Sequence, residues 1–394
     1  MNDTQKYFIH LLSSHLNNSP PEPFVSADWM GVFKLGELHN VTAMLCLSIK
    51  KLSPENRPPA KTMSLFNQAL GMTLQSYENK LSGIEILTDT FSQGNIKHIF
   101  VKGAAIRQYY PAGEVRTSGD TDVIIEKDNL EKAAELLIDK GFTLSQNSDV
   151  QNVMFFRDEE YEIKTYLDGV NSKCVEYFSK PFSKCVNTEK SAYNLEPTEH
   201  LVYVISHFLR HLTVGGVGIR QLMDIDVLLR SNEIDLNRFI NIVKELNIEK
   251  SANVLIALSK EYFNTPVEIG FKLNESLKNQ LEDVMLNGGV FGFAISDHGT
   301  TRLIRSINSN EKAGFTSSFK ALISMIFPPK KYLYNTYKYS DKCHLLLPVA
   351  FLNRLFDAVF KRGKSNSKAV KNLFSNDKTA LKISDIINEL NIEL

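Results

Sequence analysis

Hydrophobic side chains recur at helical spacing in the first part of the chain. Within residues 7–16 the apolar positions fall on one face of a helix, and the proline-rich stretch at residues 20–23 ends that pattern. A second amphipathic helix is predicted after Asp28, and a longer one from about residue 61 into the nineties. These patterns predict an N-terminal helical region over residues 1–90.

The pattern changes between residues 91 and 192, where short apolar runs alternate with turn residues. Strands are predicted at residues 96–102 and 120–126, followed by a helix that ends at Gly141. Residues 153–157 and 161–167 predict a hairpin that turns over the polar residues between them. This part of the chain therefore predicts a small mixed β-sheet.

Helical periodicity returns after residue 193. Helices are predicted from Pro197 to Leu212, at 219–229 and at 237–246, with Pro197 suited to a first helical position. A basic linker and a last amphipathic helix at about 378–390 follow. The predicted class is α+β, a small mixed-sheet core between N-terminal and C-terminal helical regions. The expected divisions are 1–90, 91–192, 193–360 and 361–394.

Composition and charge narrow the function classes. The 394 residues are 43% hydrophobic, and 45 Lys+Arg balance 45 Asp+Glu. No global positive field favours nucleic acid as a partner. The four cysteines lack metal-binding spacing, which predicts a reducing, cytoplasmic environment. The N-terminus does not look like a signal peptide, and no apolar run is long enough to predict a transmembrane segment.

The most informative chemistry lies in the segment from Gly119 to Ile125. Asp120 and Asp122 alternate around one residue of a predicted strand, so both side chains point to the same face. Two carboxylates held that close repel one another unless a cation neutralises them, and a divalent ion with oxygen ligands would do so. Upstream, Lys102 and Gly103 form a predicted strand-to-helix turn, a geometry that brings backbone N–H groups to a phosphate.

These blocks occur in a recognisable order. They are Val101 to Ala105, Tyr109, Tyr110, Arg116 and residues 119–125. Together they resemble the uncharacterised bacterial nucleotidyltransferase family of the DNA polymerase beta superfamily. Residues 161–167 resemble the third acidic strand of that family. Residues 29–39, 197–211 and 219–225 resemble its flanking helical parts, so the resemblance covers about residues 25–360.

The resemblance implies a two-metal mechanism. Asp120 and Asp122 would hold two magnesium (or manganese) ions that bind a nucleoside triphosphate such as ATP, and Glu162 would be the third carboxylate, which helps to deprotonate an acceptor. Two positions depart from the superfamily pattern: Ala104 replaces a common serine, and Lys164 stands where a histidine is expected.

Several residues have alternative candidates for the same role in the site. Glu160 and Glu176 compete with Glu162 as the third acid, which must lie opposite the face of Tyr161 and Ile163. The predicted nucleotide-binding residues are Lys102, Gly103, Ala104, Arg116, His207 and His211.

Most of these nucleotide-binding assignments have a second interpretation. Lys102 and Gly103 would otherwise form an ordinary strand-to-helix turn. Arg116 would contact a triphosphate or pair with Asp120. His207 and His211 are expected to line the cleft, although their spacing also fits zinc. Arg220 and Asp224 form an i,i+4 pair that is expected to brace helices, with a supporting role of Asp224 behind the site as the alternative. The tyrosine-rich residues 332–339 are expected to pack on their own domain, with a stacking surface for bases as the alternative.

The leading hypothesis is a magnesium-dependent nucleotidyltransferase that moves a nucleoside monophosphate to a hydroxyl or phosphate of a small molecule or biosynthetic intermediate. The first alternative is a catalytically impaired relative that binds nucleotides or proteins, motivated by Ala104 and Lys164. The second alternative is an RNA- or tRNA-directed nucleotidyltransferase. The neutral net charge does not favour this alternative.

Overall fold

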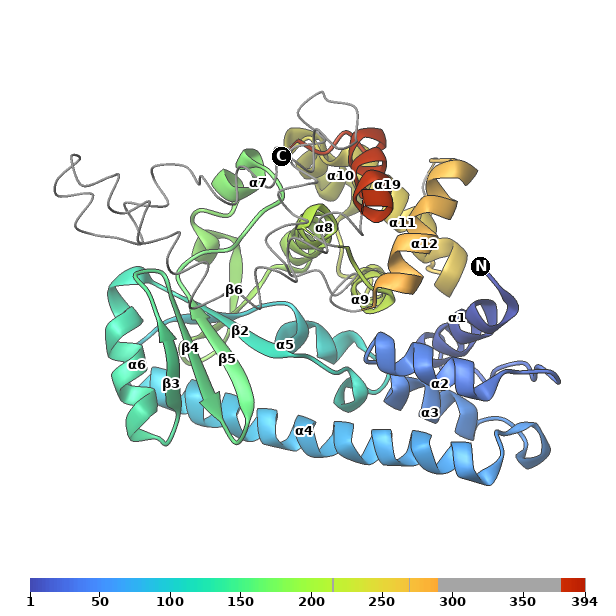
Figure 1. Ribbon diagram of the computed structural model, residues 1–394. Coiled ribbons are helices and arrows are strands. Elements are labelled where there is room, and N and C mark those ends of the chain that lie inside the picture. Colours follow the sequence, from blue (N-terminus) through green and yellow to red (C-terminus); the bar gives the residue numbers. More distant parts are fainter. Residues whose placement is uncertain (215, 269, 290–376, 394) are drawn as a thin grey trace, which may run out of the picture.

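The computed structural model describes residues 1–214, 216–268, 270–289 and 377–393. It begins with four helices: α1 (Asp3–Leu16), α2 (Trp29–Leu38), α3 (Thr42–Lys50) and α4 (Ala60–Gln93). Asn2 caps α1 and Asp28 caps α2, because each side chain accepts a hydrogen bond from a backbone N–H of the first turn. The long helix α4 runs from the N-terminal helices to the sheet along the lower edge of the molecule in Figure 1.

Seven strands form one mixed sheet in the order β3-β4-β5-β2-β1-β7-β6. Strand β2 pairs in parallel with β5, and β1 pairs in parallel with β7, while the other neighbours are antiparallel. The β4–β5 turn uses Arg157 and Asp158 at φ 50° and 64°, the conformation of a tight hairpin turn. The strand bounds are β1 (His98–Phe100), β2 (Asp120–Ile125), β3 (Thr143–Asn147), β4 (Gln151–Phe156), β5 (Glu159–Lys164), β6 (Cys185–Glu189) and β7 (Ala192–Leu195).

Helices α4 and α6 (Leu130–Asp139) cover one face of the sheet. Their apolar side chains form a cluster with the alternate residues of β2 and β5 that point to them. The members of this cluster from the two strands are Val123, Ile125, Tyr161 and Ile163. The opposite face of β2 and β5 is thereby left for the polar residues of these strands.

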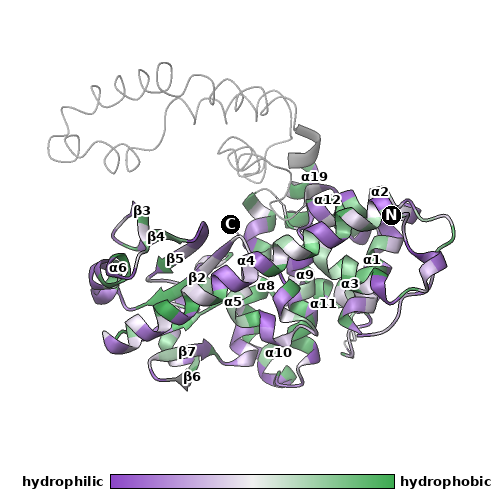
Figure 2. Ribbon diagram, turned by 90° about the horizontal axis from the view of Figure 1, so that it is seen from below, coloured by the Kyte–Doolittle hydropathy of each residue, from purple (hydrophilic) through white to green (hydrophobic). Residues whose placement is uncertain are grey.

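The C-terminal helices pack against that opposite side. Their bounds are α8 (Pro197–Val214), α9 (Ile219–Arg230), α10 (Leu236–Glu245), α11 (Glu249–Phe263), α12 (Glu275–Gly288) and α19 (Asp377–Glu389). A second apolar cluster joins these helices to α1, α2 and α3 and to the inner residues of β1 and β2. Figure 2 shows α8, α9 and α11 grouped beside α1 and α3, with hydrophobic residues where the helices meet. Two short helices, α5 (Gly103–Ile106) and α7 (Ser172–Tyr177), connect the sheet to this layer.

The α+β class, the β4–β5 hairpin and the terminal helix are confirmed. Residues 332–339 and the linker at 361–368 lie outside the described residues. The divisions at residues 90, 192 and 360 stay predictions. In the described part of the chain, no helix has both the length and the apolar composition needed to cross a membrane.

Candidate active site

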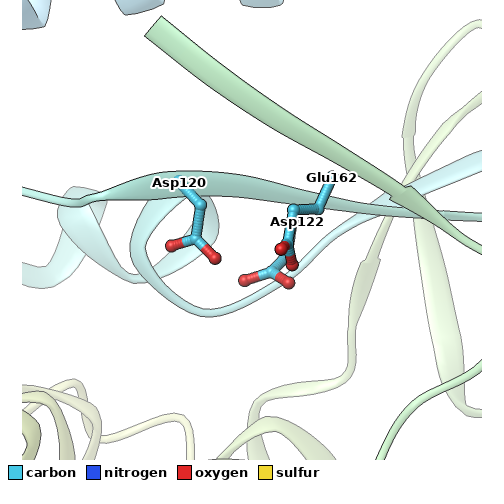
Figure 3. Close-up of side chains that lie close together, drawn as sticks. All are labelled: Asp120, Asp122 and Glu162. Carbon is cyan, nitrogen blue, oxygen red and sulfur yellow. The ribbon is translucent and has the colours of Figure 1, made fainter. Parts of the chain in front are cut away.

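The parallel pairing of β2 with β5 brings three carboxylates together. Asp122 lies opposite Glu162, and Asp120 lies opposite Glu160. Ligand oxygens of Asp120, Asp122 and Glu162 all lie within 4.8 Å of one another, and Figure 3 shows the three side chains projecting to the same side of the two strands. The required alternation is met, since Tyr161 is buried on the other face. The rival Glu160 lies beside this group, whereas Glu176 belongs to α7.

Two lysines neutralise the central carboxylate of the group. The Nζ atom of Lys102 lies 3.0 Å from Asp122 Oδ2, and that of Lys164 lies 2.6 Å from Asp122 Oδ1. Lys164 also forms an ion pair with Glu162. Burial alone would raise the pKa of Asp122, but Lys102 and Lys164 together lower it to about 2. Asp122 therefore stays ionised at neutral pH.

The turn before α5 holds Lys102 in a strained backbone conformation. Lys102 has φ 52° and ψ −129°, a region that residues with a Cβ rarely adopt. Such strain costs on the order of 1–3 kcal/mol and persists only where the surroundings enforce it. Here it directs the Lys102 ammonium to Asp122 while Gly103 begins α5.

Helix α4 fixes the loop that leads into β2. The Nζ atom of Lys80, only 2% exposed, donates to the Gly119 backbone oxygen at 2.9 Å and pairs with Glu159 at 3.1 Å. The Tyr161 hydroxyl donates to the Lys80 backbone oxygen at 3.1 Å. The position of Asp120 therefore depends on α4 as well as on the sheet.

A cavity of about 370 Å³ opens in front of the acids. Of the predicted site residues, it is lined by Lys102, Gly103, Arg116, Asp120, Asp122, His207 and His211. Ala104 is not among the described residues that line it, and Glu162 joins the site through its contact with the aspartates. The lining residues that sequence reasoning did not assign to the site include Ser118, Glu160, Arg220, Gln221 and Asp224.

Arg116 pairs with Asp224 and not with Asp120, and it lines the cavity in which its contact with a triphosphate stays a prediction. Its Nε and Nη2 atoms donate to the two carboxylate oxygens of Asp224 at 3.1 and 2.5 Å, and the Tyr110 hydroxyl donates to the same carboxylate at 2.7 Å. Among the described residues no ion pair joins Arg220 to Asp224, but Asp224 does brace α9, through Arg116, and it lines the cavity. This buried network ties α9 to the loop before β2.

His207 and His211 face each other on α8 rather than standing apart as metal ligands. Their Nε2 atoms are 2.9 Å apart, and His207 Nδ1 lies 3.3 Å from Asp168 Oδ1. Burial lowers the pKa of both imidazoles, that of His211 to about 3. Asp168 has its pKa held below the usual range by His207, Lys102 and Arg210, despite its burial. Among the described residues, the cluster with metal-ligand geometry is the acidic group and not this pair.

Long-range contacts explain why Asp168 and Arg220 were not assigned to the site from the sequence. Asp168 reaches His207 only because the chain after β5 passes α8, and Arg220 reaches Thr117 across the cavity wall at 3.0 Å. No local spacing encodes either contact. A weak signal for Ser118 was available, since it lies two residues before Asp120 in a loop already assigned to the site.

Comparison with known proteins agrees with this geometry. Residues 25–264 match the family described as uncharacterised nucleotidyltransferase. The chain belongs to this nucleotidyltransferase family. The matched range is more than half of the chain and contains the acids, both lysines and the two histidines. No curated protein and no solved structure matches the chain.

Proposed function

We propose that the protein transfers a nucleoside monophosphate from a nucleoside triphosphate to a hydroxyl or phosphate of a small molecule, with magnesium or manganese bound by Asp120, Asp122 and Glu162. One observation carries the proposal: the three carboxylates converge from two adjacent parallel strands, with ligand oxygens within 4.8 Å of one another. The donor set fits a hard divalent cation, which prefers several carboxylate oxygens.

The bound metal would neutralise charge on the triphosphate and on the oxygens exchanged at the α-phosphorus. The residues of the chain would supply the remaining functions. Glu162, at the edge of the group, would accept the proton of the acceptor hydroxyl. Lys102 would contact a phosphate oxygen, and Gly103 would allow close approach of the backbone at the start of α5. Holding both reactants in line accounts for much of the rate enhancement in such a site.

The two histidines define another part of the same cavity. With His207 Nδ1–H donated to Asp168, His207 Nε2 is an acceptor and His211 Nε2–H its donor. Their lowered pKa values keep both rings uncharged at neutral pH. They would therefore bind a nucleotide or an acceptor through hydrogen bonds rather than through charge, consistent with a polar but non-ionic group of the substrate.

A second candidate function is supported by the lysines. Lys102 and Lys164 already neutralise Asp122, and Lys164 also reaches Glu162. A site with its own cations binds a divalent metal less strongly, which favours a nucleotide-binding module of reduced catalytic activity. The two candidates differ in whether metal binding and turnover depend on the acids.

A thermal-shift screen of nucleoside triphosphates with magnesium or manganese tests the proposal. Binding to the native state raises Tm by mass action, so the donor should give a metal-dependent rise. Asp120→Asn and Asp122→Asn should abolish that rise and any pyrophosphate release, whereas Asp149→Asn at an exposed position should not. A metal-dependent rise that survives both substitutions would rule out the metal-binding role of the acids.

Binding without turnover in the wild-type protein would favour the second candidate. That outcome requires a triphosphate that raises Tm while no pyrophosphate is released with any acceptor tested.

A further inference from the structure

Two buried polar atoms on the cavity wall have no hydrogen-bond partner among the described residues. They are Ser118 Oγ and Arg220 Nε. Both residues line the cavity that contains Asp120 and Asp122, and Arg220 is only 8% exposed. A buried donor without a partner costs free energy. A ligand that supplies acceptor oxygens at this wall would remove that cost.

Among the described residues, no carboxylate forms an ion pair with Arg220, although Asp224 and Asp120 attract its charge from farther away. Its Nη1 atom donates to the backbone oxygen and to Oγ1 of Thr117, at 3.0 Å each. Within the described part of the chain, no carboxylate is in ion-pair contact with Arg220, since Asp224 pairs with Arg116. Burial, followed by repulsion from Arg116, lowers the pKa of Arg220 to about 10, which leaves it protonated at neutral pH. A buried guanidinium in this state favours an anion as its partner.

The other cations on the wall are already neutralised. Lys102 pairs with Asp122 at 3.0 Å, and Arg116 pairs with Asp224 at 2.5 Å. Among the described residues that line the cavity, Arg220 is thus the cation whose charge remains available. It lies in the first turn of α9, where backbone N–H groups and the helix dipole also favour negative charge.

Ser118 lies beside the start of α5. A Cβ atom on Gly103 would be 3.1 Å from the Ser118 Cβ atom and 2.4 Å from Arg116 Nη1. Gly103 therefore lets the two segments approach closely. The Ser118 hydroxyl faces the same cavity and has no hydrogen-bond partner among the described residues.

We propose that Ser118 and Arg220 form a phosphate subsite for the two donor phosphates that leave as pyrophosphate. This inference rests on the proposed nucleotidyl transfer. In that reaction the acceptor oxygen forms a bond to the α-phosphorus and loses its proton to Glu162. The bond from the α-phosphorus to the bridging oxygen breaks, and its electron pair stays on the pyrophosphate. Arg220 would stabilise this new negative charge.

Calorimetric titration with inorganic pyrophosphate and magnesium tests the subsite without an acceptor. We expect Arg220→Gln to weaken pyrophosphate binding at least 10-fold, since hydrogen bonds to charged groups are the stronger ones. Ser118→Ala should weaken it about 3- to 10-fold, and Arg220→Lys should retain an intermediate affinity. Arg57→Gln removes an arginine that, like Arg220, donates to backbone oxygens but lies outside the cavity, and it is the matched control, with an unchanged affinity.

The stability of the variants separates ligand binding from a structural role. Arg220→Gln should keep or raise Tm without ligand, because it removes a buried charge that lacks a carboxylate. A purely structural Arg220 would instead lower Tm and leave pyrophosphate affinity unchanged. The subsite is overturned if wild-type protein does not bind pyrophosphate with magnesium, or if Arg220→Gln binds it equally well. Nucleotidyl transfer would still stand if triphosphate binding depends on Asp120 and Asp122.

Discussion

Asp122 lies directly opposite Glu162 in the parallel pairing of β2 with β5, and the Lys164 ammonium contacts both carboxylates. The three side chains come from positions fixed by strand register, so a slip of one residue would turn Glu162 to the apolar face. The acids are therefore held by the sheet itself, and the lysine balances their repulsion when no metal is bound.

Replacing Lys164 should reveal competition between this lysine and a metal. Lys164→Met removes a cation that contacts Asp122 and Glu162, so we expect Mn²⁺ affinity to rise about 10-fold, or about 1.4 kcal/mol. Without metal, the variant should be less stable because the carboxylates then repel one another. Calorimetric titration with Mn²⁺ measures the change. Lys140→Met, at an exposed position, is the matched control. Weaker Mn²⁺ binding by Lys164→Met would mean that the lysine positions the acids instead.

The backbone strain at Lys102 can be measured by a pair of substitutions. Lys102→Gly and Lys102→Ala both lose the ammonium that contacts Asp122, but only glycine adopts φ 52° without strain. We therefore expect the glycine variant to exceed the alanine variant in free energy of unfolding by about 1–2 kcal/mol. Urea denaturation at neutral pH provides both values. Equal stabilities would show that the turn relaxes without cost.

Two glycines of α4 should respond to alanine in opposite directions. A Cβ atom on Gly83 would lie 2.0 Å from the hydroxyl oxygen of the buried Tyr161, whereas one on Gly71 would meet nothing within 4 Å. We expect Gly83→Ala to reduce the free energy of unfolding by about 1–3 kcal/mol through overpacking. Gly71→Ala should raise it by up to about 1 kcal/mol through helix propensity. Thermal or urea unfolding tests this, and a stabilising Gly83→Ala would contradict the packing of α4 on β5.

Stability should decline as the pH falls below about 6.5. Burial lowers the pKa of His15, His39 and His200 to about 4 and that of His211 to about 3. Below pH 6.5 the histidines of the unfolded chain bind protons, whereas those of the folded protein do not. The free energy of unfolding therefore decreases progressively from about pH 6.5 toward pH 4. Each histidine contributes about 2 kcal/mol to the loss between pH 7 and 5.

His200 provides the most direct check of that pH dependence. Its Nε2 atom has no hydrogen-bond partner among the described residues, so His200→Leu removes a titrating group without removing a bond at this atom. The difference in free energy of unfolding between pH 7 and pH 5 should shrink by about 2 kcal/mol in this variant. An unchanged difference would exclude His200 as a source of the acid sensitivity.

The carboxylate site could be predicted from the sequence because strand alternation is a local rule. Asp120 and Asp122 share a face in any extended segment, and the apolar Tyr161 and Ile163 assign Glu162 to the opposite one. Contacts between distant elements could not be predicted in the same way. The ion pair between Arg116 and Asp224 depends on where α9 packs, and sequence spacing alone indicated only Arg220 as a neighbour of Asp224.

The helices were predictable for the same reason, since hydrophobic periodicity and capping residues such as Asp28 act within one or two turns. The lack of a hydrogen-bond partner for Arg220 Nε among the described residues was not predictable. It depends on the simultaneous burial of several groups from the β2 loop and α9, which only the packed structure specifies.

The hydrogen bond from Lys80 to the Gly119 oxygen has a consequence for protein engineering. Because that lysine belongs to a helix of 34 residues, which also contacts α3, a recombinant fragment trimmed to the strands alone would lack the support under its first aspartate. The smallest fragment that retains the acids in place should therefore begin upstream of Ala60.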